Sequence, residues 1–271
     1  MSQARTAIAW LARALAIGLL AFAIFGPLAN LLLWTVAERW YFPHALPSQY
    51  GFGFWARVFS PRGGALDSLG NSLLVALLTV VFALLLAIPA GYALARLKLP
   101  FRALILLVFL IPQAFPNLSV YVNVARLFYE FRLNGTIPGV VLVHVTHGLV
   151  YAVWIATAAF AAVEPELEEA ARSVGAGGLR AFRDVTLPLA MPGLMASAIF
   201  VFLESLDEFT GSYFVGAPDV AMLPLLLYSA GAGGNYQIAS ITALLLLIPS
   251  IGFMLVVERF LKADVLSKVG R

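Results

Sequence analysis

The chain has 271 residues, of which 62% are hydrophobic and 11% charged, with a formal net charge of +3. Soluble domains carry about 25% charged residues, so this composition excludes an ordinary soluble domain and predicts a polytopic membrane protein. Cysteine is absent, which excludes disulfides and thiolate metal sites, and the sequence has no basic stripe with interleaved aromatics that would indicate nucleic-acid binding.

Six segments are long and apolar enough to cross a membrane, since a spanning helix needs roughly 20 mostly apolar residues. The expected spans are 14–37, 70–95, 102–126, 139–161, 193–215 and 238–260. Arg5 and Arg13 precede the first span, as basic residues precede the apolar segment of a signal peptide. Its apolar run is longer than the roughly 7–15 residues of a cleavable segment, so we expect a retained anchor. The predicted fold is all-α, with six transmembrane helices in a single domain over 1–271.

The distribution of Lys and Arg predicts the orientation, because these residues are enriched on the cytoplasmic side. With the N-terminus inside, 12 of the 17 basic residues are cytoplasmic. The five outer ones are Arg39, Arg57, Arg62, Arg126 and Arg132. We therefore expect both termini, and the loop between the fourth and fifth spans, in the cytoplasm.

The longest outer connection, about 38–69, is rich in Trp, Tyr and Phe. Such residues favour the interface between lipid and water, so a loop close to the membrane is the preferred interpretation, and a docking surface for a substrate-binding protein is the alternative. Prolines interrupt several spans, including Pro112 and Pro116 in the third. We expect static kinks at these prolines, with gating hinges as the alternative.

The cytoplasmic loop 164–192 contains a short predicted helix. Pro165 suits its first turn, and the glutamates around it complement the positive end of the helix dipole. Gly175 supplies a stop that can adopt positive φ. A second short helix is expected over Leu179–Val185, ending before Pro188. The first helix carries a narrow apolar stripe of Leu167, Ala170, Ala171 and Val174, thin enough to lie in a groove of another protein.

The residues of this loop match a longer pattern. Its members are Glu169, Ala170, Ala171, Gly175, Leu187 and Pro188, with Val185 in place of an isoleucine. This spacing resembles the EAA-x3-G-x9-I-x-LP loop with which the permease subunits of ATP-binding-cassette (ABC) importers bind their ATPases. The alternative, an amphipathic loop lying on the lipid surface, explains the apolar stripe but not the joint occurrence of these residues.

The resemblance extends from Asn71 through the sixth span. Within it, Ser205–Phe209, Phe214–Pro218 and Leu223–Leu225 resemble the spermidine/putrescine branch. Subunits for ferric iron, thiamine and aminoethylphosphonate are similar, so the cargo stays open between a polyamine-like compound and another small polar solute. The resemblance implies the MetI-like fold of type I importers and a location in the bacterial inner membrane.

The resemblance also implies partners. These are an ABC ATPase dimer, a second permease subunit that is expected to be a different chain, and a periplasmic or lipid-anchored substrate-binding protein. The sequence has no GxxxxGK[ST] pattern of the P-loop kind, so ATP hydrolysis is expected on a separate polypeptide. No cofactor and no catalytic residue is expected in this chain.

Ionisable side chains inside the spans are the candidate path residues. Glu204, Asp207 and Glu208 are spaced to share one helical face, and a carboxylate at mid-membrane costs on the order of 3 kcal/mol. They therefore line a watery path or form hydrogen bonds between helices. His144 and His147 also share a face. Metal binding by these two is less favoured than a hydrogen-bonded helix contact, because no third ligand is evident.

Two other classes of membrane protein fit the sequence less well. A membrane-embedded enzyme would need a catalytic constellation, and no HExxH, GxSxG or facing pair of aspartates is found. A proton-coupled secondary transporter could use the carboxylates of the fifth span. However, six spans without an inverted repeat do not favour it, and it leaves the cytoplasmic loop unexplained.

Overall fold

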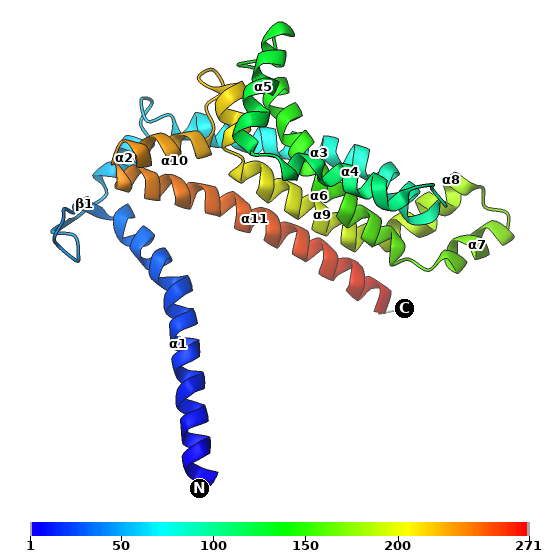
Figure 1. The fold of residues 1–271 in the computed structure, drawn as a ribbon, viewed down its shortest axis with the longest axis horizontal. Coiled ribbons are helices and arrows are strands. Elements are labelled where there is room, and N and C mark those ends of the chain that lie inside the picture. The colour runs from blue at the N-terminus through cyan, green and yellow to red at the C-terminus, as the bar shows by residue number, and fades with distance from the viewer. Residues whose placement is uncertain (1, 270–271) are drawn as a thin grey trace. The chain divides into compact units, whose positions relative to one another are not determined.

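The computed structural model describes the backbone of residues 2–269 and the side chains of residues 10, 11 and 13–259. The chain is mostly helical, as predicted (Figure 1). Its elements are α1 (Ser2–Thr35), β1 (Ala37–Arg39), β2 (Gln49–Tyr50), α2 (Gly53–Val58), α3 (Ala65–Arg96), α4 (Arg102–Ala114), α5 (Asn117–Glu130), α6 (Ile137–Ala161), α7 (Pro165–Ser173), α8 (Gly178–Ala181), the π-helix η1 (Phe182–Thr186), α9 (Leu187–Asp207), the π-helix η2 (Ser212–Gly216), α10 (Leu223–Ala232) and α11 (Tyr236–Val269).

The helices form two compact units. One runs to Ala65 and includes Leu227–Leu244, and the other contains Leu66–Leu226 and continues from Leu245. The orientation of the termini stays a prediction. Four of the basic residues on which it depends lie outside the described side chains, namely Arg5, Lys262, Lys268 and Arg271.

The first unit contains α1 and a short hairpin. Residues 13–35 of α1 are apolar enough to span a membrane. Strands β1 and β2 pair antiparallel with an irregular register, a feature the all-α prediction did not include. Trp34 stacks on Trp40 with ring centroids 4.3 Å apart, and the Trp55 indole N–H donates to the Thr35 carbonyl at 2.7 Å. These aromatic contacts order the connection that was expected to be a loop close to the membrane.

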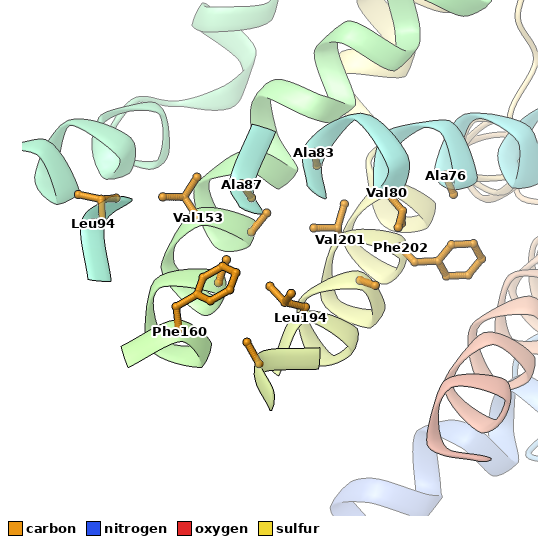
Figure 2. Close-up of a cluster of buried hydrophobic side chains, with 14 of the residues drawn as sticks. Ala76, Val80, Ala83, Ala87, Leu94, Val153, Phe160, Leu194, Val201 and Phe202 are labelled. Atoms are coloured by element: carbon orange, nitrogen blue, oxygen red, sulfur yellow. The ribbon is translucent and has the colours of Figure 1, made fainter. Parts of the chain in front are cut away.

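The core of the second unit lies between α3, α6 and α9 (Figure 2). Helix α3 contributes Ala76, Val80, Ala83 and Ala87, whose spacing places them on one helical face. They pack against larger buried side chains such as Phe160 of α6 and Phe202 of α9. Small residues on facing helices let the backbones approach closely, which is how helices associate where lipid removes the hydrophobic driving force.

Five helical segments of the described residues are long and apolar enough to span a membrane. They are Arg13–Thr35, Ala65–Arg96, Ile137–Ala161, Gly178–Asp207 and Tyr236–Arg259. A sixth span exists if the bent pair α4 and α5 is counted as one. The predicted third span, 102–126, is therefore wrong as a single helix, because α4 and α5 meet at 92°. Phe115 has an extended backbone before Pro116, the conformation that a following proline favours.

The predicted fifth span, 193–215, has wrong limits. The helical stretch begins at Gly178 and ends at Asp207, after which Glu208 is extended. The expected helix end before Pro188 is also wrong. The π turn of η1 shifts the hydrogen-bond register, so that the Leu187 N–H donates to the Phe182 carbonyl. Pro188 then falls in the first turn of α9, where its missing N–H costs little.

Candidate functional site

Helix α7 and the turn after it have the geometry expected from the sequence. The helix begins at Pro165 and ends at Ser173, and Gly175 adopts a φ of +94°. The Gly175 N–H donates to the Arg172 carbonyl at 3.0 Å, and the Ala176 N–H donates to the Ala171 carbonyl at 3.1 Å. These two bonds form a Schellman motif, which uses a glycine at the left-handed position. The predicted glycine stop is confirmed.

The outward face of α7 carries most of the predicted loop motif. Glu169 and Ala170 are exposed, and the apolar Val174 is 87% exposed. Beyond the glycine turn, Leu179 of α8 is 81% exposed. Two exposed apolar side chains therefore flank the Gly175 turn. Gly175 is exposed as well, whereas Ala171 of α7 and Leu187 and Pro188 in the first turn of α9 are partly buried.

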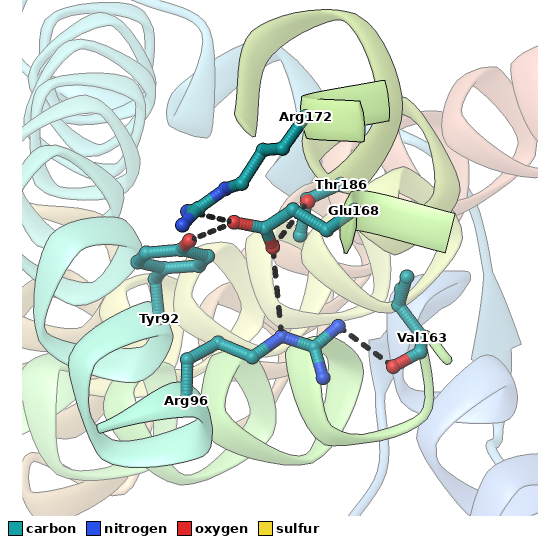
Figure 3. A network of polar contacts seen from close by, with 6 residues as sticks. All are labelled: Tyr92, Arg96, Val163, Glu168, Arg172 and Thr186. Carbon is teal, nitrogen blue, oxygen red and sulfur yellow. Dashed lines mark hydrogen bonds and ion pairs between the residues drawn. The ribbon is translucent and has the colours of Figure 1, made fainter. Parts of the chain in front are cut away.

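The inward face of α7 carries Glu168, which is 6% exposed (Figure 3). Tyr92 of α3 donates its hydroxyl to Oε1 of this carboxylate at 2.7 Å, and Arg172 donates to the same oxygen at 2.7 Å. Thr186 of η1 donates to Oε2 at 2.9 Å, and the Arg96 Nε lies 3.9 Å from Oε2. One carboxylate therefore joins α7 to α3 and to the helix that leads into α9. We call these five side chains the Glu168 network.

The network is electrostatically favourable for an ionised carboxylate. Burial raises the pKa of Glu168. The hydrogen bonds from Tyr92, Thr186 and Arg172, together with the charge of Arg172, outweigh this effect and hold the pKa below its ordinary value of 4.5. The sequence did not identify Glu168, because it sits among similar glutamates and its partners lie on distant segments.

The histidines of α6 form hydrogen bonds between helices, as favoured from the sequence. His144 is buried, with Nδ1 2.7 Å from the Ser205 Oγ and Nε2 2.9 Å from the Ser212 Oγ. The His147 Nε2 lies 2.8 Å from the Glu204 carboxylate. Among the described residues, no group of three or more His, Cys, Asp or Glu could hold a metal ion.

The three candidate path carboxylates have different surroundings. Glu204 is partly exposed and pairs with His147, and Asp207 is exposed at the end of α9. Glu208 is buried, lies beyond the last residue of α9, and accepts a hydrogen bond from the Gly211 N–H at 2.6 Å. The three carboxylates therefore differ in exposure and in their partners, and their role in a path stays a prediction.

A small cavity lies beside the break between α4 and α5. Its volume is about 150 Å³, and its wall includes Asn117, Tyr121, Thr146 and His147 among mainly apolar neighbours. The Tyr121 hydroxyl lies 3.4 Å from the His147 Nδ1, a long distance for a hydrogen bond. The Tyr121 hydroxyl, which has only this long contact among the described residues, and His147, which pairs with Glu204, therefore line a cavity beside the bend between α4 and α5.

Sequence relatives of this chain are membrane transport proteins. The chain is 33% identical to the "Putative ABC transporter permease protein ORF1" of Streptomyces antibioticus, over 73% of this chain and 87% of that protein. It is 31% identical to the "Trehalose transport system permease protein SugB" of Mycobacterium tuberculosis, over 82% of each chain. It is 28% identical to the "Putative 2-aminoethylphosphonate transport system permease protein PhnV" of Salmonella typhimurium, over 88% of this chain and 89% of that protein.

Solved structures share the fold. A bacterial ABC transporter involved in the import of the acidic polysaccharide alginate superposes with a TM-score of 0.70 at 18% identity, covering 93% of this chain and 96% of that chain. The MetNI methionine ABC transporter in an inward-facing conformation gives a TM-score of 0.58 at 18% identity, covering 73% of this chain and 95% of that chain. Residues 83–263 match the family model of the inner membrane component of binding-protein-dependent transport systems. The chain belongs to this family and is a multi-pass permease subunit of an ABC importer.

Proposed function

We propose that this chain forms half of a solute path and that α7, with the Gly175 turn, is its binding element for a separate ATPase. The observation that carries the proposal is the two-sided character of α7. Its outward face exposes Glu169, Ala170 and Val174, while Glu168 fixes its inward face to the membrane helices. A surface exposed in this way and yet rigidly held is suited to transmit a movement made by a partner.

The proposed assembly contains an ABC ATPase dimer, a second permease subunit encoded as a different chain, and a periplasmic or lipid-anchored substrate-binding protein. The family description supports a binding protein, and the motif Glu169, Ala170, Ala171, Gly175, Leu187 and Pro188 supports the ATPase. With both termini and residues 164–192 in the cytoplasm of a bacterial cell, α7 lies on the side where ATP is available.

We propose a small polar solute as the cargo. The relatives described above transport, by name, a disaccharide and an aminophosphonate. The cargo class is therefore broader than the polyamines that Ser205–Phe209 and its neighbouring segments resemble. The carboxylates of Glu204, Asp207 and Glu208 are proposed to line the passage, and the pairing of Glu204 with His147 offers both an acceptor and a donor to a polar solute.

The test of the proposed ATPase contact is co-purification with the cognate ATPase from membranes. Glu169→Lys reverses a charge on the exposed face of α7, so we expect the membrane-inserted subunit to lose its ATPase. Glu130→Lys is the matched control, because Glu130 is an exposed carboxylate at the end of α5, on the predicted outer side. Equal retention of ATPase by both variants would refute the assignment.

A further inference from the structure

We propose that Glu168 is a positioning residue that makes α7 move as one body with the Arg96 end of α3 and the first turns of the helix leading into α9. The inference rests on the proposed function of α7. It goes beyond the loop motif, because the motif residue Glu169 points outward whereas its neighbour Glu168 is buried. Consecutive residues on a helix are about 100° apart, so one residue can face a partner while the next faces the spans.

The hydrogen bonds of the Glu168 carboxylate oppose sliding of α7 along α3 or η1. Both oxygens are engaged, Oε1 by Tyr92 and Arg172 and Oε2 by Thr186, with Arg96 close by (Figure 3). The donors come from three different elements. Moving α7 relative to α3 or η1 would break charge-assisted hydrogen bonds in a buried site, where their loss is most costly.

Arg96 extends the link to the connection that enters α7. Its guanidinium donates to the Val163 carbonyl at 2.7 Å, between the end of α6 and the start of α7. Its side chain is 12% exposed, and its Nε has no hydrogen-bond partner, although it lies near the Glu168 carboxylate. The same arginine therefore holds the chain just before α7 and faces the anion that holds α7 itself.

The covalent connection on the other side of α7 is a turn rich in glycine. Gly175, Gly177 and Gly178 occupy three of the four positions after Val174, and nothing lies within 4 Å of a side chain placed at either of the first two. Glycine has the greatest backbone freedom of any residue. The Glu168 network bridges this turn, since it connects α7 directly with Thr186.

The hydroxyl of Tyr92 is held in place by aromatic packing. Its ring makes edge contacts with Phe160 of α6 and Phe182 of η1, at centroid distances of 5.6 and 4.8 Å. Tyr92→Phe should preserve this packing and remove only one hydrogen bond to Glu168. It therefore separates the role of the network from the stability of the core.

The decisive measurement is the distance between spin labels on α7 and α3 in the full-length chain, reconstituted in lipid nanodiscs. The chain has no cysteine, so Ser173→Cys and Leu86→Cys, both at exposed positions, give a defined labelled pair. We call α7 docked when the Glu168 network holds it against α3, and undocked when it has moved away. We expect Glu168→Gln and Tyr92→Phe each to raise the ratio of undocked to docked α7 by about tenfold or more, because each variant loses a hydrogen bond to a charged group. Unchanged distance distributions in both would overturn the inference.

Two controls separate positioning from general damage. Glu166→Gln changes an exposed carboxylate of the same helix and should leave the distribution unchanged. Thr186→Ser keeps the hydroxyl that Thr186→Val removes, so only the valine variant should undock α7. Undocking by Glu166→Gln, or equally by both Thr186 variants, would contradict the specific role of the carboxylate.

A second readout uses the complex with its ATPase. Because Glu168→Gln leaves the outward face of α7 intact, the ATPase should still co-purify, while stimulation of ATP hydrolysis by the binding protein should fall at least several-fold. Unchanged stimulation would refute a mechanical role for Glu168. Failure of the unmodified chain to retain any ATPase would instead refute the proposed function, and the label distances would still test the network.

Discussion

The Gly175 turn can be perturbed without creating a clash. Its φ of +94° is disfavoured for any residue with a side chain, yet no atom lies within 4 Å of a Cβ built at this position. Gly175→Ala therefore introduces only backbone strain. Left-handed geometry costs a non-glycine residue roughly 1–3 kcal/mol, which lowers the equilibrium constant for forming the native turn about 5- to 150-fold. Gly175→Val adds the resistance of a β-branched side chain.

Gly177 supplies the matched control for this prediction. It is two residues away and equally open, but its φ of −66° and ψ of 160° are accessible to alanine. Gly177→Ala should be neutral, or stabilise the turn by about 0.4–1 kcal/mol by restricting the unfolded chain. The two substitutions thus make the same chemical change, but only Gly175→Ala is expected to destabilise the turn.

The assay is co-purification of the ATPase, followed by ATP-dependent uptake in proteoliposomes. We expect Gly175→Ala to retain membrane insertion and lose most ATPase association, Gly175→Val to abolish transport, and Gly177→Ala to behave like the unmodified protein. Equal activity of Gly175→Ala and Gly177→Ala would refute the reasoning, because the two positions differ chiefly in the sign of φ.

Three further predictions concern packing, pH and the path. Gly193→Val should destabilise the packing of α6 and α9 by about 1–3 kcal/mol, because its Cβ would lie 2.4 Å from an alanine Cβ of α6. Gly252→Val is the control, since open space surrounds that position. The free energy of unfolding in mixed detergent micelles measures both effects. The pKa of Glu168 is lowered on folding, so its stabilisation of α7 is full above the ordinary pKa of 4.5 and is lost as pH falls through the folded value. Label distances should therefore differ between the unmodified chain and Glu168→Gln at neutral pH and converge in acid. Glu204→Gln and Asp207→Asn should alter uptake rate or affinity in vesicles, and unchanged uptake in both would remove these residues from the path.

Local signals in the sequence were sufficient for several elements. Most spans follow from apolar length alone, since each helix in lipid must satisfy its own backbone hydrogen bonds. The stop at Gly175 follows from the near-unique tolerance of glycine for positive φ. Neither inference requires knowledge of which other segment lies nearby.

Other features depend on neighbours that sequence spacing does not identify. The bend of 92° at Phe115 was expected only as a proline kink, because a proline marks a break but not the direction in which the next helix leaves. Pro188 was expected to end a helix, but the π turn before it accommodates the missing N–H. The fifth span therefore begins earlier than its hydropathy suggested.

The sequence by itself determined a helical membrane subunit with a helix, a glycine turn and a second helix between two spans, because hydrophobic length and backbone preference are local properties. Only the tertiary structure decided that Glu168 faces inward and Glu169 outward. The physical reason is that a glutamate can be buried only where donors surround it. Those donors, Tyr92 of α3 and Thr186 of η1, lie 76 residues before it and 18 residues after it and meet only in the folded chain.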